Sequence, residues 1–276
     1  MNDSQRDVND SQRDVHDSQG GVNDSQRDVH DSQGGVNDSQ RGAHDSQRVG
    51  SAANPFRFAS VVFDADSTLA SIEGIDWLGA LRGESVGLEI QQLTDRAMSG
   101  ELALEQVYAA RLDVIKPTRD EITALGSVYV TAVEQGAAEL IAELQASGVR
   151  VEIVSGGLRD ALLPLADHLG VSRDAVHAVE LMHDAAGHYV SLAAAQWLSQ
   201  QDGKPRVVRE LALPHLSAMI GDGSTDAAVR GETDAFFAYT AVARRPNVVA
   251  AADAEARSFA ELRALLINPF EQLGVR

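Results

Sequence analysis

The chain has 276 residues, of which 41 are acidic, 23 are basic and none is cysteine. The lack of cysteine excludes disulfide bonds, thiol catalysis and cysteine metal sites. A net charge of −18 disfavours binding to nucleic acid or to an anionic membrane surface, so we expect neither partner. Without an apolar run of about 18 residues or a recognisable signal sequence, the expected location is the cytoplasm.

The first 50 residues differ in composition from the rest of the chain. Residues 2–50 are seven tandem copies of a seven-residue unit such as NDSQRDV or HDSQGGV. Each copy contains at most one large aliphatic side chain, too little apolar surface to offset the entropy of folding. A coiled coil needs two apolar positions in every seven, so the period does not favour one. We therefore expect residues 1–54 to be a disordered tail with no chemistry of its own.

The ordered part is predicted to begin with a short buried strand, Phe58–Phe63, in which apolar and β-branched residues run together. Four helical segments follow with no strand between them, separated by stops that contain Gly, Ser or Pro. The expected helices are 74–81, 86–98, 103–115 and 119–129. This run predicts a small helical insertion after the first strand.

Strands and helices then alternate along the chain. Strands are expected at 149–154, 216–220 and 235–239, a β-hairpin at 176–192 around the turn 184–187, and helices at 134–146, 158–169, 205–212 and 259–266. Such alternation indicates an α/β fold with a doubly wound, Rossmann-like parallel sheet and helices on both faces. Ligands bind such sheets outside the carboxyl ends of the strands.

Carboxylates follow two of the predicted strands. Asp64 and Asp66 come after the first strand, and Asp222 and Asp226 follow the strand at 216–220. Four carboxylates at one sheet edge would repel one another unless a cation lay among them, and oxygen ligands without His or Cys favour Mg²⁺. Each aspartate alone could instead be a helix N-cap or a turn residue. The set predicts a magnesium site, which would let an acidic protein bind an anion.

Two other features are weak signals when taken alone. Ser155-Gly156-Gly157 offers a hydroxyl and main-chain N–H groups to an anion, although the same residues could form an ordinary strand-to-helix turn. Lys204 lies at the start of a predicted helix and could be a solvated side chain.

Four motifs, in order, resemble those of the haloacid dehalogenase superfamily. They are FDADST at 63–68, Ser155, Lys204 and GDGSTD at 221–226. The segments 63–76 and 95–100 are closer still to the phosphoserine phosphatases of that superfamily. The resemblance covers essentially the whole chain after the tail. It implies a catalytic core formed by 55–73 and 134–276, with a helical cap formed by 74–133.

The resemblance implies two-step hydrolysis of a small molecule, O-phosphoserine, which is the last step of serine synthesis. Asp64 would be the nucleophile and form an aspartyl-phosphate, while Asp66 would act as general acid and then as general base. Mg²⁺ would be held by Asp64, by the main-chain carbonyl of Asp66 and by Asp222, with Asp226 in support. The alternative is a related phosphatase or phosphotransferase acting on another small phosphomonoester.

The resemblance also implies a set of substrate contacts. The phosphate oxygens would be bound by Ser155, Gly156 and Lys204. Glu73 would take the amino group of the substrate and Arg96 its carboxylate, which suits a bidentate guanidinium. Outside this motif context, Glu73 and Arg96 would read as a surface salt bridge. The pocket would be completed by Met98, Gly157 and Thr225.

One segment departs from the family pattern. After Phe237 the family usually has a short Gly-rich turn, whereas this chain has the longer segment 238–247, which contains Arg244 and Arg245. The resemblance therefore does not predict the structure of the outer rim of the site.

Overall fold

The structure is a computed structural model that describes residues 54–194 and 196–268. The chain divides into two units, 1–50 and 51–276. The first unit, and with it nearly all of the tail expected at 1–54, lies outside the described residues. No helix in the part of the chain that the structure describes is long and apolar enough to cross a membrane.

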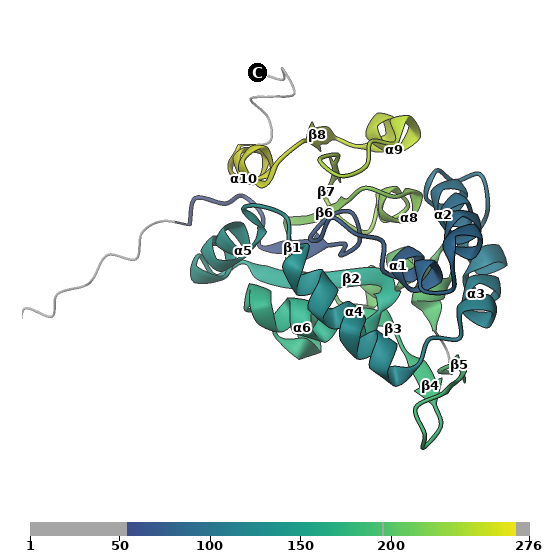
Figure 1. Ribbon diagram of the computed structural model, residues 1–276. Helices are drawn as coiled ribbons and strands as arrows, with labels where there is room; N and C mark the ends of the chain where they lie inside the picture. The colour runs from purple at the N-terminus through teal and green to yellow at the C-terminus, as the bar shows by residue number, and fades with distance from the viewer. Residues whose placement is uncertain (1–53, 195, 269–276) are drawn as a thin grey trace, which may run out of the picture. The chain divides into compact units, whose positions relative to one another are not determined.

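Six parallel strands form the main sheet, in the order β3-β2-β1-β6-β7-β8 (Figure 1). They are β1 Ser60–Phe63, β2 Arg150–Leu158, β3 Val176–Val179, β6 Ser217–Gly221, β7 Ala235–Tyr239 and β8 Ala254–Ala256. The chain runs outward from β1 to β3 and then returns to β6 on the other side of β1. This order confirms the predicted Rossmann-like sheet and places its topological switch point between β1 and β6.

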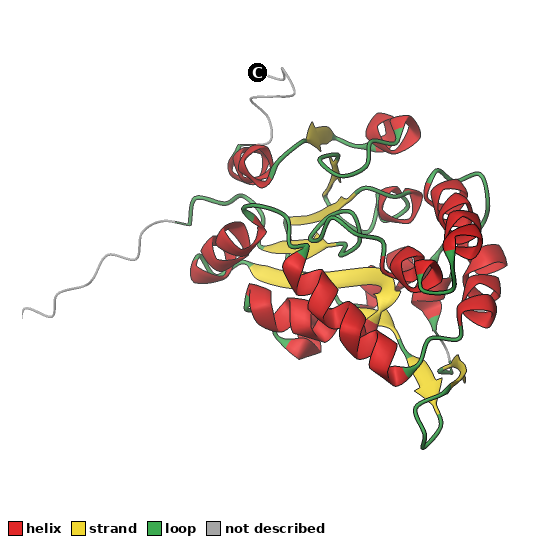
Figure 2. Cartoon of the chain, viewed as in Figure 1, coloured by secondary structure: helices red, strands yellow, loops and turns green. Residues whose placement is uncertain are grey.

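Helices surround the sheet (Figure 2). They are α1 Gly74–Ala80, α2 Glu84–Met98, α3 Leu104–Ile115, α4 Arg119–Thr131, α5 Ala137–Ala146, α6 Arg159–Leu169, α7 Gly203–Glu210, α8 Ser224–Ala227, α9 Pro246–Ala251 and α10 Phe259–Ile267. Helix α5 contacts both α6 and α10, and α8 contacts both α7 and α9, as expected for helices that cover two faces.

Local sequence explains several element ends. Helix α4 begins at Arg119 because the Thr118 side chain accepts the Glu121 N–H while the Glu121 carboxylate accepts the Thr118 N–H, forming a capping box. Helix α6 ends at Leu169, and Gly170 after it adopts a φ of 69°, the left-handed conformation that favours glycine.

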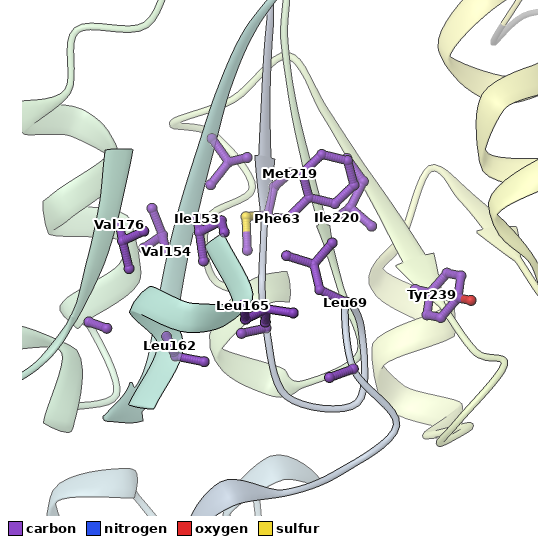
Figure 3. Close-up of a cluster of buried hydrophobic side chains, with 14 of the residues drawn as sticks. Phe63, Leu69, Ile153, Val154, Leu162, Leu165, Val176, Met219, Ile220 and Tyr239 are labelled. Carbon is purple, nitrogen blue, oxygen red and sulfur yellow. The ribbon is translucent and has the colours of Figure 1, made fainter. Parts of the chain in front are cut away.

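The core lies where the central strands meet the helices (Figure 3). Phe63 of β1 is fully buried and stacks on Phe259 of α10, with ring centroids 6.4 Å apart. Phe259 also packs against Tyr239 of β7, at 5.0 Å between centroids. Leu162 and Leu165 of α6 are also fully buried. This packing anchors β1 in the core, so the loop that follows it begins at a fixed position.

The β-hairpin predicted at 176–192 is wrong in its first half. Val176–Val179 is strand β3, which pairs in parallel with β2 at the edge of the main sheet. Only β4, Leu181–His183, and β5, Tyr189–Leu192, form the antiparallel hairpin. A single residue separates β3 from β4, so the sequence pattern did not distinguish the two strands. The short elements α9 and β8 were not predicted, because three to six residues carry too little periodicity.

The four helices predicted between the first strand and 134–146 are α1 to α4. Helices α1, α2 and α3 contact one another, whereas α4 lies along α6 of the sheet layer (Figure 1). Gly126 allows this close approach, because a Cβ there would lie 2.9 Å from Pro164 Cγ. Helix α4 is therefore tied to the sheet more directly than α2 and α3 are. The division into core and cap stays a prediction.

Candidate active site

Three buried carboxylates lie together at the carboxyl edge of the sheet. Asp64 follows β1, Asp222 follows β6, and Asp226 lies in helix α8 just beyond. Strands β1 and β6 are neighbours, so the loops after them meet at the switch point. One ligand oxygen of each residue lies within 4.8 Å of those of the other two, and no residue of the three is more than 5% exposed. The structure thus brings three of the four expected aspartates into one group, and the fourth, Asp66, lines the same cavity as Asp64 and Asp222.

This group fits a magnesium ion. Its donors are all oxygen atoms, the ligands that Mg²⁺ prefers, and among the described residues no His or Cys joins the group to favour another metal. Carboxylates buried this close together also repel one another, and a divalent cation would relieve that repulsion. Asp66, whose main-chain carbonyl is the further predicted ligand, lies two residues after Asp64 in the same loop.

Lys204 is buried between two of these carboxylates. Its Nζ atom lies 2.9 Å from Asp64 Oδ1 and 2.6 Å from Asp226 Oδ1. Burial by itself would lower the pKa of this ammonium group, but Asp226 and Asp64 outweigh burial and raise the pKa of Lys204 above its usual value. The other Asp226 oxygen accepts the main-chain N–H of Gly223 at 3.0 Å. Lys204 is therefore a fixed positive charge beside Asp64, rather than a solvated side chain.

Asp66 is held by two donors on a single carboxylate oxygen. The main-chain N–H of Gly74 lies 3.0 Å from Asp66 Oδ1, and the hydroxyl of Tyr129 lies 2.5 Å from it. Burial and the negative charge of Asp64 raise the pKa of Asp66 to about 7, although the two hydrogen bonds favour the charged form. A carboxyl group that titrates near neutrality can both give and take a proton, as general acid–base catalysis requires.

A cavity of about 30 Å³ lies beside these carboxylates. The predicted site residues that line it are Asp64, Asp66, Glu73, Met98, Gly156, Lys204, Asp222 and Thr225. Ser155 and Gly157 flank the lining residue Gly156, and the fully buried Ser155 hydroxyl oxygen accepts the Gly157 N–H at 3.0 Å. Most of the residues implied by the resemblance therefore surround one small space.

Glu73 stands immediately before helix α1. Its Oε1 atom accepts the Ser67 hydroxyl at 2.7 Å. Burial and the nearby Asp66 carboxylate raise the pKa of Glu73 to about 8. A positively charged group that reached this carboxylate inside the cavity would be stabilised by it.

The structure does not place Arg96 with the other predicted residues. Its side chain is 52% exposed and pairs with Glu101 at 3.2 Å, and it does not line the cavity. The guanidinium group in the cavity wall belongs instead to Arg111 of α3, which is only 3% exposed. Arg111 Nη1 donates to Thr94 Oγ1 at 2.6 Å, and Thr94 in turn donates to Asp76. Arg111 Nε is buried without a hydrogen-bond partner, so this group has an unused donor.

A sequence signal for Arg111 was available. Leu104, Val107, Tyr108 and Arg111 share one face of helix α3 at the helical spacing of three and four residues, and the first three are buried. An arginine on the apolar face of an amphipathic helix must find a buried partner or a ligand. Tyr108 on the same face donates to the Gly156 carbonyl at 2.7 Å and so links α3 to the carboxyl end of β2.

Arg245 is a second functional candidate that sequence reasoning did not single out. It precedes helix α9, and its side chain is 11% exposed. One guanidinium nitrogen donates to the Asp222 carboxylate, and the other terminal nitrogen lies 3.8 Å from Glu73 Oε1. The segment 238–247, which departs from the family pattern, therefore supplies a cation at the edge of the acidic group.

Known proteins resemble most of the described part of the chain. A family model described as haloacid dehalogenase-like hydrolase matches residues 61–229. The chloroplastic phosphoserine phosphatase of Arabidopsis thaliana is 34% identical over 199 residues, which are 70% of this chain and 67% of that protein.

Solved structures agree with the sequence matches. The crystal structure of a phosphoserine phosphohydrolase-like protein from Francisella tularensis subsp. tularensis SCHU S4 has a TM-score of 0.70 and 27% identity, covering 75% of this chain and 99% of that one. A phospho-aspartyl intermediate analogue of phosphoserine phosphatase has a TM-score of 0.62 and 25% identity, covering 75% of this chain and 96% of that one.

Proposed function

Because the chain belongs to the haloacid dehalogenase-like hydrolases, we propose that it hydrolyses O-phosphoserine to serine and phosphate, with Mg²⁺ as its cofactor. One observation carries the proposal beyond the family. A single cavity is lined by Asp64 and Asp66, by the cation Lys204, by the half-buried carboxyl group of Glu73 and by the buried guanidinium group of Arg111. These groups match the phosphate, the amino group and the carboxylate of that substrate.

The first chemical step forms a covalent intermediate on Asp64. Its carboxylate oxygen attacks phosphorus, and the bond from phosphorus to the serine oxygen breaks. Asp66 gives its proton to that oxygen, so serine leaves as a neutral alcohol. The proposal is supported by the analogue of a phospho-aspartyl intermediate solved for a similar phosphatase.

The second step returns the enzyme to its starting state. A water molecule attacks the phosphorus of the aspartyl-phosphate while Asp66, now charged, takes the proton of that water. The bond from phosphorus to the Asp64 oxygen breaks and phosphate is released. Asp66 is again protonated and Asp64 is again a carboxylate. The raised pKa of Asp66 suits both halves of this cycle.

The residues that would hold Mg²⁺ are the carboxylates of Asp64 and Asp222 and the main-chain carbonyl of Asp66, with Asp226 in support. When bound, the ion offsets the negative charge of the phosphate and of the nucleophile. Asp226 has both carboxylate oxygens occupied, by Lys204 and by the Gly223 N–H, so we propose that its main role is to orient Lys204.

The phosphate oxygens would be bound by Ser155, by the main chain around Gly156 and by Lys204, with Met98, Gly157 and Thr225 completing the pocket. The donors of Ser155, Gly156 and Lys204 would face the phosphate oxygens, whose negative charge is redistributed during the transfer. Preorganised donors accelerate a reaction most where charge changes in this way. Lys204 needs no rearrangement for this role, because its position is already set by Asp64 and Asp226.

Recognition of the serine part would use Glu73 for the amino group and Arg111, in place of Arg96, for the carboxylate. The unused Nε donor of Arg111 and its position in the cavity wall support this assignment. A guanidinium group binds a carboxylate through two parallel hydrogen bonds, which also sets the orientation of the substrate.

A cavity of about 30 Å³ has room for only about two water molecules. Admission of O-phosphoserine therefore requires movement of part of the wall. We propose that α2 and α3, within the predicted cap 74–133, move away from the core 55–73 and 134–276. Tyr108 would then release the Gly156 carbonyl on opening and bind it again on closing.

Phosphate release from a panel of phosphomonoesters tests the proposal. The panel contains O-phosphoserine, phosphoethanolamine, which lacks the carboxylate, and phosphoglycolate, which lacks the amino group, each with Mg²⁺ and with a chelator. We expect O-phosphoserine to give the highest kcat/KM, with activity lost in chelator and in Asp64→Asn. Preference for another monoester would instead favour a related phosphatase or phosphotransferase.

Three further expectations stay predictions. They are the cytoplasmic location and the absence of nucleic-acid and membrane partners. The location needs its own test, since one similar protein is chloroplastic.

A further inference from the structure

Asp66 has two carboxylate oxygens that are not equivalent in this structure. Oδ1 accepts both the Gly74 N–H and the Tyr129 hydroxyl, at 3.0 and 2.5 Å. Oδ2 faces the carboxyl end of β2, since it lies 3.1 Å from the position of a Cβ on Gly157. In the proposed reaction the phosphate is bound at this end of β2, so Oδ2 is the oxygen on the side of the leaving group.

We infer that Tyr129 is a positioning residue which, by hydrogen bonding to Asp66 Oδ1, leaves Oδ2 as the oxygen that carries the proton to the leaving group. This inference rests on the proposed function. With two donors on Oδ1, a proton on that oxygen would face two other hydrogen atoms, whereas Oδ2 is available to it. The same two contacts fix the plane of the carboxyl group, and therefore the direction in which it delivers the proton.

The placement of Tyr129 suits a fixed support better than a moving one. It lies on α4, the helix that packs along α6 through Gly126 and Pro164, and its side chain is fully buried. Movement of α2 and α3 would leave this contact intact. The absence of a side chain at Gly74 leaves room for the Tyr129 hydroxyl, because a Cβ at that position would lie 2.2 Å from the hydroxyl oxygen.

A purely structural role is the competing explanation, since any buried tyrosine hydroxyl requires an acceptor. The two roles differ in how the effect of losing the hydroxyl depends on the leaving group. Serine leaves as an alkoxide unless it is protonated, whereas p-nitrophenolate is a stable anion that needs little help from an acid. Loss of acid positioning therefore slows one substrate selectively, and structural damage slows both.

The experiment measures kcat/KM of Tyr129→Phe with O-phosphoserine and with p-nitrophenyl phosphate. This parameter covers the steps up to formation of the aspartyl-phosphate, so the basic role of Asp66 does not enter it. A general acid contributes about 10²- to 10⁴-fold, and we expect the variant to lose about 10- to 100-fold with O-phosphoserine. With p-nitrophenyl phosphate we expect a loss below about threefold, because that transfer needs little acid. An equal loss with both substrates, or no loss with either, would overturn the inference.

Tyr239→Phe is the matched control. Tyr239 is also buried, and its hydroxyl donates to a carboxylate, Glu134 Oε2, at 2.9 Å, away from the cavity lining. The same chemical deletion there should leave the ratio of the two kcat/KM values unchanged. Gly74→Ala is a second variant, in which the tyrosine stays but its hydroxyl is displaced, and it should show the same selective loss as Tyr129→Phe.

Failure of this inference is distinguishable from failure of the proposed function. If the wild-type protein does not hydrolyse O-phosphoserine, the substrate assignment fails. The comparison is then made with the best alkyl phosphate of the panel, where the selective loss in Tyr129→Phe still decides the role of Tyr129. If the wild-type protein hydrolyses no phosphomonoester, both conclusions are overturned.

Discussion

Arg245 donates hydrogen bonds to both the carboxylate and the main-chain carbonyl of Asp222, which lies 23 residues earlier in the chain. Asp222 is one of the three buried carboxylates that fit Mg²⁺. A guanidinium group cannot be deprotonated in a protein, so any metal ion at this site competes with a permanent cation for the same residue. When no metal is bound, the positive charge of Arg245 also reduces the repulsion between the clustered carboxylates.

We therefore expect Arg245→Gln to bind Mg²⁺ more tightly than the wild-type protein. Removing one charged hydrogen bond from Asp222 frees the carboxylate at a gain of about 1.5 kcal/mol, which corresponds to an affinity about tenfold higher. Isothermal titration calorimetry with Mg²⁺ and no substrate measures this directly. Arg244→Gln is the control, because Arg244 pairs with Glu255 at 2.9 Å on the surface. Weaker binding by Arg245→Gln would mean that the arginine orders the site for the metal.

Two arginines of the predicted cap are distinguished by steady-state kinetics. Arg111→Gln should raise KM for O-phosphoserine by about 100-fold or more, because a charged bidentate contact is worth several kcal/mol. Arg96→Gln should leave KM within about twofold, since exposed ion pairs contribute little. The opposite ranking would restore the assignment made from the sequence and reject the one made from the cavity.

Lys204 should be important for stability as well as for catalysis. Lys204→Met leaves Asp64 and Asp226 buried without their cation, and breaking a buried pair in this way costs about 3–5 kcal/mol. Urea unfolding in the presence of chelator measures the loss. The same substitution at Lys116, which is exposed, should change the free energy of unfolding by less than about 0.5 kcal/mol. Equal stability of the two variants would contradict the burial of Lys204.

Deletion of residues 2–50 tests the interpretation of the tail. Every residue assigned to the proposed site lies between 64 and 245, so we expect unchanged kcat, KM and Tm in the shortened protein. A fall in Tm of more than about 3 °C, equivalent to about 1 kcal/mol for a body of this size, would show that the repeat contributes to the fold.

Sequence alone determined the parts of this protein that are encoded by contiguous residues. The alternation of strands and helices predicted the parallel sheet, and the pairs Asp64–Asp66 and Asp222–Asp226 were found because each follows an apolar strand directly. The carboxyl ends of parallel strands lie at one edge of a sheet, so the sequence predicted that Asp64, Asp222 and Asp226 share that edge, and the pairing of β1 with β6 brings them together. The short elements α9 and β8 were missed because they carry almost no period.

Tertiary structure alone decided which distant side chains complete the site. The apolar face of α3 indicates that Arg111 is buried, but only the packing of α2 and α3 places Arg111 in the cavity wall and leaves Arg96 outside it. Tyr129 reaches Asp66 across 63 residues, and Arg245 reaches Asp222 from an irregular segment. Contacts of this kind depend on where whole helices and loops are packed, and no local pattern of residue types encodes that packing.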